Sequence, residues 1–68
     1  MNEDMIKGNW KQLKGKVKEK WGKLANDDLA WIEGQRDYLI GKIQERYGVA
    51  KSDAVKQVHE FERSFRAH

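Results

Sequence analysis

Residues 13–22 read LKGKVKEKWG, and 26 positions later residues 39–48 read LIGKIQERYG. The two stretches share leucine, glycine, lysine, glutamate and glycine at matching positions, and the Val/Ile, Lys/Arg and Trp/Tyr differences are conservative. The chain's glycines follow the same rule, because they form two triplets spaced by seven residues: Gly8, Gly15, Gly22 and Gly34, Gly41, Gly48. The sequence therefore predicts an internal duplication within a single domain, 1–68, with repeat units at approximately 6–32 and 33–58.

Each repeat unit predicts a helix, a tight turn and a second helix. The apolar residues of the first unit fall within about 80° of a helical wheel, which is typical of one buried helix face. These residues are Ile6, Trp10, Leu13, Val17, Trp21 and Leu24. We expect an all-α fold with four helices, at approximately 5–21, 27–33, 35–47 and 52–66.

A chain of 68 residues without cysteine buries little surface, so neither half is expected to fold alone. The sequence predicts one core that joins both halves. Its expected members are Trp10, Leu13, Val17, Trp21, Ile32, Leu39, Ile43, Tyr47, Val58 and Phe61. Asn26 or Asp27 is expected to cap the second helix of the first unit, and Ser52 or Asp53 that of the second unit.

The glycines are predicted to have structural roles. Gly22 and Gly48 each follow the last apolar residue of a helix, so both are expected to end it with a positive φ. Gly15 and Gly41 lie mid-helix opposite the apolar stripe, where glycine costs about 1 kcal/mol relative to alanine. Either a second helix approaches this bare backbone, or the helix bends there. Both Gly-Lys pairs lack the earlier glycine and the Ser or Thr of a phosphate-binding loop.

The polar residues do not form a catalytic or metal-binding pattern. His59 lies about 100° from the apolar stripe and is expected to be exposed, and His68 is the last residue. Ser52 is placed as a cap without an adjacent base, and Asp27 and Asp28 are better explained as a helix start than as a calcium loop. We therefore expect no enzyme, no catalytic residue, no cofactor, no metal and no evident small-molecule substrate.

The positive charge is concentrated in one segment. Residues 5–23 carry seven lysines against a single acid, Glu19. Four of these lysines, here called the lysine ridge, share one face of the predicted first helix: Lys7, Lys11, Lys14 and Lys18. Three interpretations remain open: a solvated face above the core stripe, a weak contact with nucleic acid or another polyanion, or a membrane surface into which Trp10 and Trp21 insert.

The sequence has no run of about 18 apolar residues and no basic and apolar leader at its start. We expect no transmembrane segment, and the absence of cysteine permits a redox-neutral compartment.

Residues 8–24, GNWKQLKGKVKEKWGKL, resemble the signature of the CsbD-like family of small bacterial stress-response proteins. Residues 33–36, EGQR, followed by residues 41–48, GKIQERYG, resemble the same family. The resemblance covers roughly residues 2–62 and departs only at the C-terminal tail. Its G-x-W and G-K-x-x-E-x-W-G elements are specific.

This resemblance implies a four-helix bundle of two packed helical hairpins, similar to sterile-alpha-motif folds. It implies a cytoplasmic protein that is abundant under general stress and has no established molecular activity. We expect a monomer with a protective or accessory role. The alternative is weak, sequence-independent binding of nucleic acid or an anionic surface through the lysine ridge. A helix-hairpin-helix grip on DNA is disfavoured, because each turn offers only one glycine.

Overall fold

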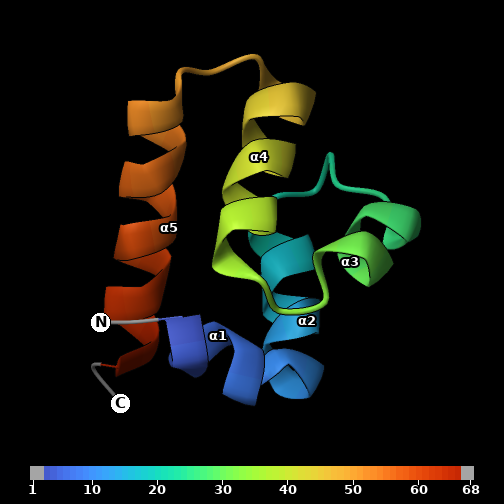
Figure 1. Ribbon diagram of the computed structural model, residues 1–68, viewed down its shortest axis with the longest axis vertical. Coiled ribbons are helices and arrows are strands. Elements are labelled where there is room, and N and C mark those ends of the chain that lie inside the picture. Colours follow the sequence, from blue (N-terminus) through green and yellow to red (C-terminus); the bar gives the residue numbers. More distant parts are fainter. Residues whose placement is uncertain (1–2, 67–68) are drawn as a thin grey trace.

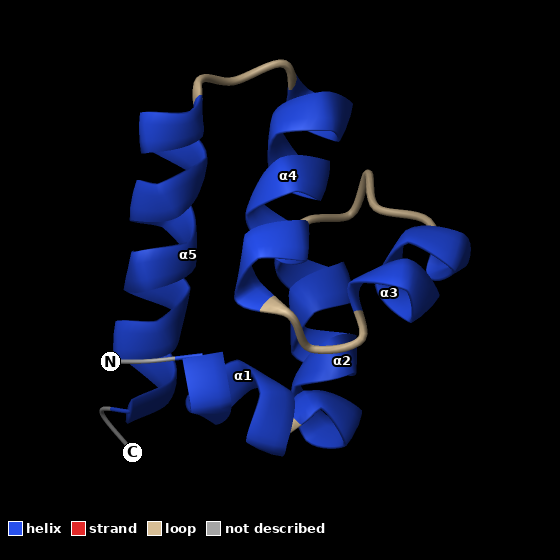
Figure 2. Ribbon diagram, in the orientation of Figure 1, coloured by secondary structure: helices blue, strands red, loops and turns tan. Residues whose placement is uncertain are grey.

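The computed structural model describes residues 3–66, and over that range the chain forms five α-helices joined by short loops (Figures 1 and 2). They are α1 (Glu3–Gly8), α2 (Trp10–Lys20), α3 (Asn26–Ile32), α4 (Arg36–Tyr47) and α5 (Lys51–Arg66). No strand occurs in this part of the chain, so the all-α prediction is confirmed. α4 and α5 run antiparallel side by side, and α1 crosses near the opposite end from their connecting loop (Figure 1). His68 lies outside the described residues.

The predicted first helix, 5–21, is divided in two at Asn9, so the described residues form five helices where four were expected. Asn9 has a non-helical φ of −116°, and its carbonyl accepts hydrogen bonds from the backbone N–H groups of Gln12 and Leu13. Gly8 weakens a helix and asparagine favours its first boundary position, which explains the break. The break lets α1 turn away from α2 and place Ile6 in the core.

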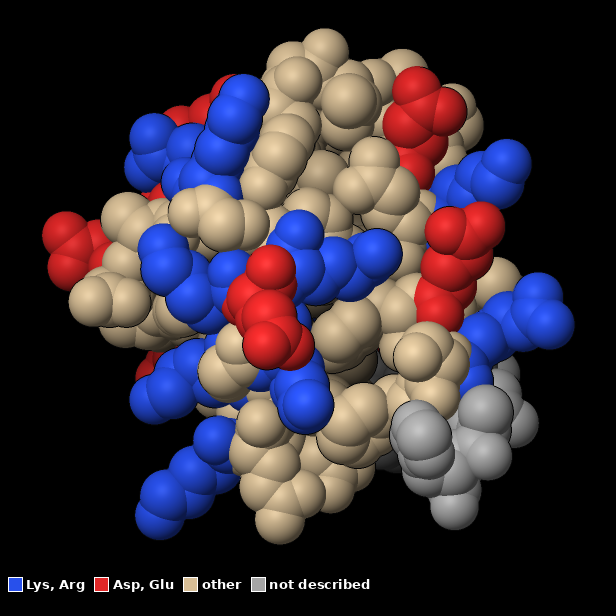
Figure 3. Space-filling view, turned by 180° about the vertical axis from the view of Figure 1, so that it is seen from behind, with Lys and Arg blue, Asp and Glu red and all other residues tan. Residues whose placement is uncertain are grey.

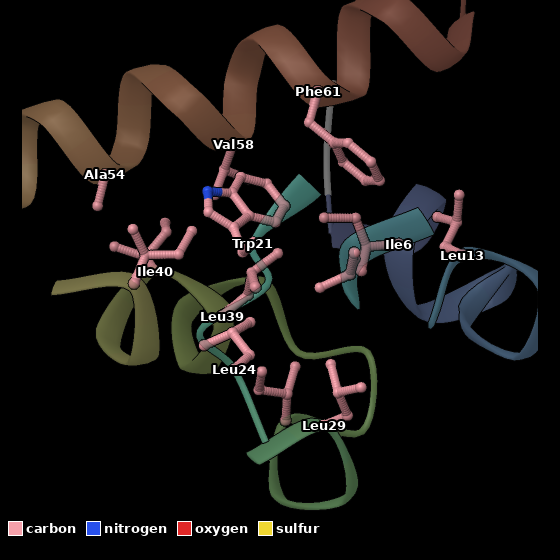
Figure 4. Close-up of a cluster of buried hydrophobic side chains, with 13 residues drawn as sticks. Ile6, Leu13, Trp21, Leu24, Leu29, Leu39, Ile40, Ala54, Val58 and Phe61 are labelled. Atoms are coloured by element: carbon pink, nitrogen blue, oxygen red, sulfur yellow. The ribbon is translucent and has the colours of Figure 1, made fainter. Parts of the chain in front are cut away.

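A single hydrophobic core joins both halves of the chain (Figure 4). Eight of the ten predicted core residues are buried, while Trp10 and Tyr47 are partly buried against the same cluster. Trp21 lies against Phe61 of α5, with ring centroids 5.3 Å apart. The core also includes residues that the predicted list omitted: Ile6, Leu24, Leu29, Ile40 and Ala54. Burial of both stripes in one cluster is the arrangement expected of halves too small to fold alone.

The two first helices of the repeats end differently. Gly48 ends α4 in the left-handed region, with φ 66°, as predicted. The same prediction for Gly22 is wrong, because Gly22 is not among the glycines with positive φ. α2 already stops at Lys20, and the side-chain ammonium of Lys18 donates to the carbonyls of Gly22 and Leu24. The loop after α2 is therefore held by a lysine side chain, without a left-handed residue at Gly22.

Gly34 makes the close approach that was one of two alternatives for the mid-helix glycines. Its φ is 80°, and a Cβ at this position would lie 3.0 Å from Lys7 Cα and 3.0 Å from Trp10 Cβ. Gly15 and Gly41 have nothing within 4 Å of the corresponding point, so the packing explanation for them is wrong. Backbone contact therefore occurs at the corner where the α3–α4 turn meets the α1–α2 junction.

The predicted caps are also displaced. Ala25 is the N-cap of α3, so Asn26 is already helical, and α5 begins at Lys51, which places Ser52 and Asp53 inside its first turn. The Asp28 carboxylate instead accepts a hydrogen bond from the backbone N–H of Ala25 at 2.9 Å. An acid in the third helical position that reaches back to the N-cap backbone satisfies a donor that the helix leaves free.

The aromatic residues at matching repeat positions each bind the other half. Trp21 Nε1 donates to Gln57 Oε1 of α5 at 2.9 Å. The Tyr47 hydroxyl accepts from the backbone N–H of Lys23, in the loop after α2, at 3.1 Å. The second helices of the two units differ in length, since α3 has 7 residues and α5 has 16. The halves are thus joined by reciprocal polar contacts as well as by the core.

Candidate functional site

The four lysines of the ridge are all exposed, but they lie on two helices. Lys11, Lys14 and Lys18 share one face of α2, because they are spaced by three and four residues. Lys7 lies on α1, beyond the break at Asn9. Seen from behind, lysine and arginine side chains gather over part of the molecular surface, with acidic side chains between and around them (Figure 3).

Lys18 differs from the other ridge lysines, because its ammonium is already engaged. It donates to Gly22 O at 3.3 Å and to Leu24 O, the two carbonyls that follow the end of α2. Lys18 is therefore a structural residue as well as a surface charge, and the freely available part of the lysine ridge is Lys7, Lys11 and Lys14.

The membrane-surface interpretation required two tryptophans at the surface of the first helix. Trp21 is buried in the core with 2% of its surface exposed, and Trp10 is partly buried. The exposed tryptophan is instead Trp31 of α3, which stacks on Tyr38 of α4 with ring centroids 4.3 Å apart. Lys42 Nζ lies 5.0 Å from the Trp31 ring centroid, which adds a cation–π contact to this pair.

Asp28 is buried and joins two helices, α3 and α4. Its carboxylate accepts two hydrogen bonds from Arg46 of α4, each 2.9 Å long, and lies 3.4 Å from Lys42 Nζ. The hydrogen bonds from Arg46 and from the Ala25 N–H hold the pKa of Asp28 well below its ordinary value, against the opposing effect of burial. Asp28 is therefore an anion at neutral pH, and it fixes α3 on α4.

Glu62 of α5 is the second buried carboxylate, with 1% of its surface exposed. Its Oε2 accepts a hydrogen bond from Arg36 Nε at 2.9 Å, and its buried Oε1 has no hydrogen-bond partner. This pair joins the first turn of α4 to the last part of α5. Neither Glu62 nor Asp28 was predicted from the sequence to form an ion pair.

The sequence carries a signal for Asp28, because the matching position of the second repeat unit has a different kind of residue. The duplicate of Asp28 is Ala54, 26 positions later, and Ala54 is fully buried in the core. An acid at a position where the second unit has a small buried residue indicates a buried acid with a partner. Glu62 lies beyond the second repeat unit, so the duplication gives no such signal for it.

Residues 3–66 contain no group of three or more His, Cys, Asp and Glu side chains placed to bind a metal ion. His59 is exposed on α5, where it was expected. Across the described helices, none has the length and apolar character needed to span a bilayer.

Comparisons with known proteins give a consistent result. The sequence profile of a family described as CsbD-like matches residues 4–57. The chain is 63% identical over 62 residues to the UPF0337 protein YjbJ of Escherichia coli (strain K12), covering 91% of this chain and 90% of the relative. It is 57% identical to the UPF0337 protein ECA0631 of Pectobacterium atrosepticum, covering 100% and 99%. The UPF0337 protein PA4738 of Pseudomonas aeruginosa is 56% identical over 61 residues, covering 90% and 94%.

Proposed function

The chain belongs to the CsbD-like family, and from this premise we propose that it is a small bacterial stress-response protein with an accessory or protective role and no catalysis. The absence of catalysis is supported by the way in which the two buried carboxylates are bound. Asp28 and Glu62 are both bound by arginines of α4, so each serves to join helices. A carboxylate held as an anion far below neutral pH, as Asp28 is, makes a poor general acid or base.

The proposal includes a cytoplasmic monomer. The family resemblance supports the location.

The test is stress survival of a host strain from which the gene has been deleted. Deletion is expected to reduce survival after osmotic or heat stress, with normal growth in its absence, and a plasmid copy is expected to restore it. Protein abundance should rise in the same stress. Equal survival of the two strains under every stress that raises the abundance would contradict the proposal.

The second candidate function is loose binding of a polyanion through the lysine ridge. It is favoured by the exposure of Lys7, Lys11 and Lys14 in a region of high positive charge. The ridge contains lysines only and no arginine fork, so sequence-specific contacts to base edges are not expected. Three to four phosphate contacts give a slope of about −3 to −4 in a plot of log affinity against log salt concentration.

A salt titration of binding to nonspecific duplex DNA tests this candidate. The variant Lys7→Gln, Lys11→Gln, Lys14→Gln should weaken binding and flatten the salt slope. A matched control, Lys16→Gln, Lys51→Gln, Lys56→Gln, makes the same charge change at exposed sites outside the ridge. Equal weakening by the two triple variants would assign the effect to net charge, and no binding at low salt would remove the candidate.

A further inference from the structure

A hollow of about 310 Å³ lies between α2 and α3. Its lining, here called the α2–α3 groove, consists of Lys14, Gly15, Lys18, Asn26, Leu29 and Ala30. Leu29, Ala30 and the bare backbone of Gly15 supply apolar atoms, while two lysines and an asparagine supply polar ones. A few polar groups around apolar atoms, at the lower end of the usual pocket volume, are typical of a site for a small ligand.

The charged side chains that line the groove are all positive. Lys14 and Lys18 are both lysines and no lining residue is acidic. Lys18 is also fixed in place, because its ammonium donates to the carbonyls of Gly22 and Leu24. An ammonium has three N–H donors, so one remains for a ligand. A charge held in position by the protein loses little freedom when it binds an anion.

Gly15 contributes to this hollow by having no side chain. The helix continues through Gly15, where glycine is unfavourable, and a Cβ at this position would meet nothing within 4 Å. Sterics inside the protein therefore do not require glycine here. A side chain longer than alanine would instead extend from the lining of the α2–α3 groove.

We propose that the α2–α3 groove binds a small amphipathic anion: an apolar ring or short chain that carries one carboxylate, sulfonate or phosphate group. The apolar part lies against Leu29, Ala30 and the Gly15 backbone, and the anionic group meets the ammonium groups of Lys14 and Lys18. This inference goes beyond the proposed function and does not depend on it. A second hollow, between α2 and α5, fits this chemistry less well because Glu19 is among its lining residues.

The experiment is a backbone amide NMR titration of the whole protein with four probes. Two are amphipathic anions, 2-naphthoate and octanoate, which separate an aromatic from an acyl-chain source. Neutral 2-naphthalenemethanol tests the apolar part alone, and inorganic sulfate tests the charge alone. We expect saturable shifts at residues 14–18 and 26–30 with one or both amphipathic anions, at a Kd of about 0.1–1 mM.

The matched variants use the duplication. Gly15→Leu fills the groove and should reduce affinity by at least about tenfold, while Gly41→Leu places the same side chain at the corresponding site of α4, outside the groove, and should leave affinity unchanged. Neither Cβ meets another atom within 4 Å, so both side chains begin in open space, and circular dichroism checks that the two variants keep their helices. Lys14→Gln should weaken the two anions and leave 2-naphthalenemethanol unaffected.

Several results would overturn the proposal. These are unchanged binding in Gly15→Leu, equal shifts from sulfate and 2-naphthoate, shifts spread over the surface lysines, or no saturation by either amphipathic anion. Duplex DNA binding measured on Gly15→Leu separates this groove from the lysine ridge. The variant should lose the small anion while its DNA affinity stays as it was.

Discussion

Gly34→Ala is expected to be the most damaging alanine substitution at any glycine in the chain. The new Cβ would lie 3.0 Å from Lys7 Cα, 3.0 Å from Trp10 Cβ and 3.2 Å from Trp10 Cγ. Lys7 Cα is backbone, so it moves only if α1 moves. Overpacking of this kind costs about 1–3 kcal/mol, and the left-handed φ of 80° costs a residue with a Cβ about 1–2 kcal/mol more.

The expected loss is therefore about 2–5 kcal/mol. Small domains have about 0.05–0.15 kcal/mol of stability per residue, which gives about 3–10 kcal/mol for 68 residues. The substitution should thus remove a large part of the stability, and it should do so by separating α1 from the α3–α4 turn.

Urea unfolding followed by circular dichroism measures the loss, and Gly48→Ala is the matched control. Gly48 has a similar φ of 66°, but a Cβ there meets nothing within 4 Å. Gly48→Ala should therefore cost only the conformational part, about 1–2 kcal/mol. Equal losses for Gly34→Ala and Gly48→Ala would refute the close approach at Gly34.

The remaining predictions concern the ion pair, the core and the mid-helix glycines. Asp28→Ala should cost about 1–3 kcal/mol at neutral pH. Because folding lowers the pKa of Asp28, its contribution to the free energy of unfolding is complete above the ordinary carboxyl pKa of about 4 and is lost as the pH falls below that value. Urea unfolding at several pH values should therefore show the stabilities of the wild type and Asp28→Ala converging in acid. Trp21→Ala should cost about 3–5 kcal/mol in urea unfolding, and a peptide of residues 1–33 should show no cooperative melt, which a cooperative helical monomer would contradict. Gly15→Ala and Gly41→Ala should each raise stability by about 0.5–1 kcal/mol in thermal unfolding, and a loss at either site would show a contact that the structure lacks.

The apolar stripes and the end of α4 could be predicted from the sequence, because they depend on local spacing. The heptad-spaced apolar residues predicted Leu13, Val17 and Ile43 as core, and a glycine after the last apolar residue predicted the left-handed turn at Gly48. Helical periodicity and a C-terminal glycine both act within one or two turns. Such local features can be predicted from the sequence without knowing which other segment the helix packs against.

Predictions made from the repeat are wrong where the two halves of the structure differ. Gly22 and Gly48 both follow an aromatic residue, but the loop after α2 is bound by Lys18, and Gln44 stands at the matching position of α4. The position of Gly34 against α1 depends on a contact between distant segments, and no local pattern reveals it. The predicted repeat therefore gave the features that the two stretches share and missed those in which they differ.

The candidate site could be predicted from the sequence only in part, because it too depends on contacts between segments that are distant in the sequence. The lysine ridge follows from spacing, whereas its division at Asn9 and the engagement of Lys18 depend on how the chain turns. The α2–α3 groove requires knowledge of which face of α3 meets α2. Sequence spacing identified the charged residues but not the hollow beside them.

The central claim is that this protein acts in stress as a folded domain, and complementation of the deletion strain with two variants tests it most directly. The first is the triple ridge variant at Lys7, Lys11 and Lys14, which should keep its stability, and the second is Trp21→Ala, which should lose a large part or all of it. We expect the ridge variant to restore survival after stress, and Trp21→Ala, expressed at an equal level, not to restore it. Full rescue by an unfolded Trp21→Ala protein would contradict the claim.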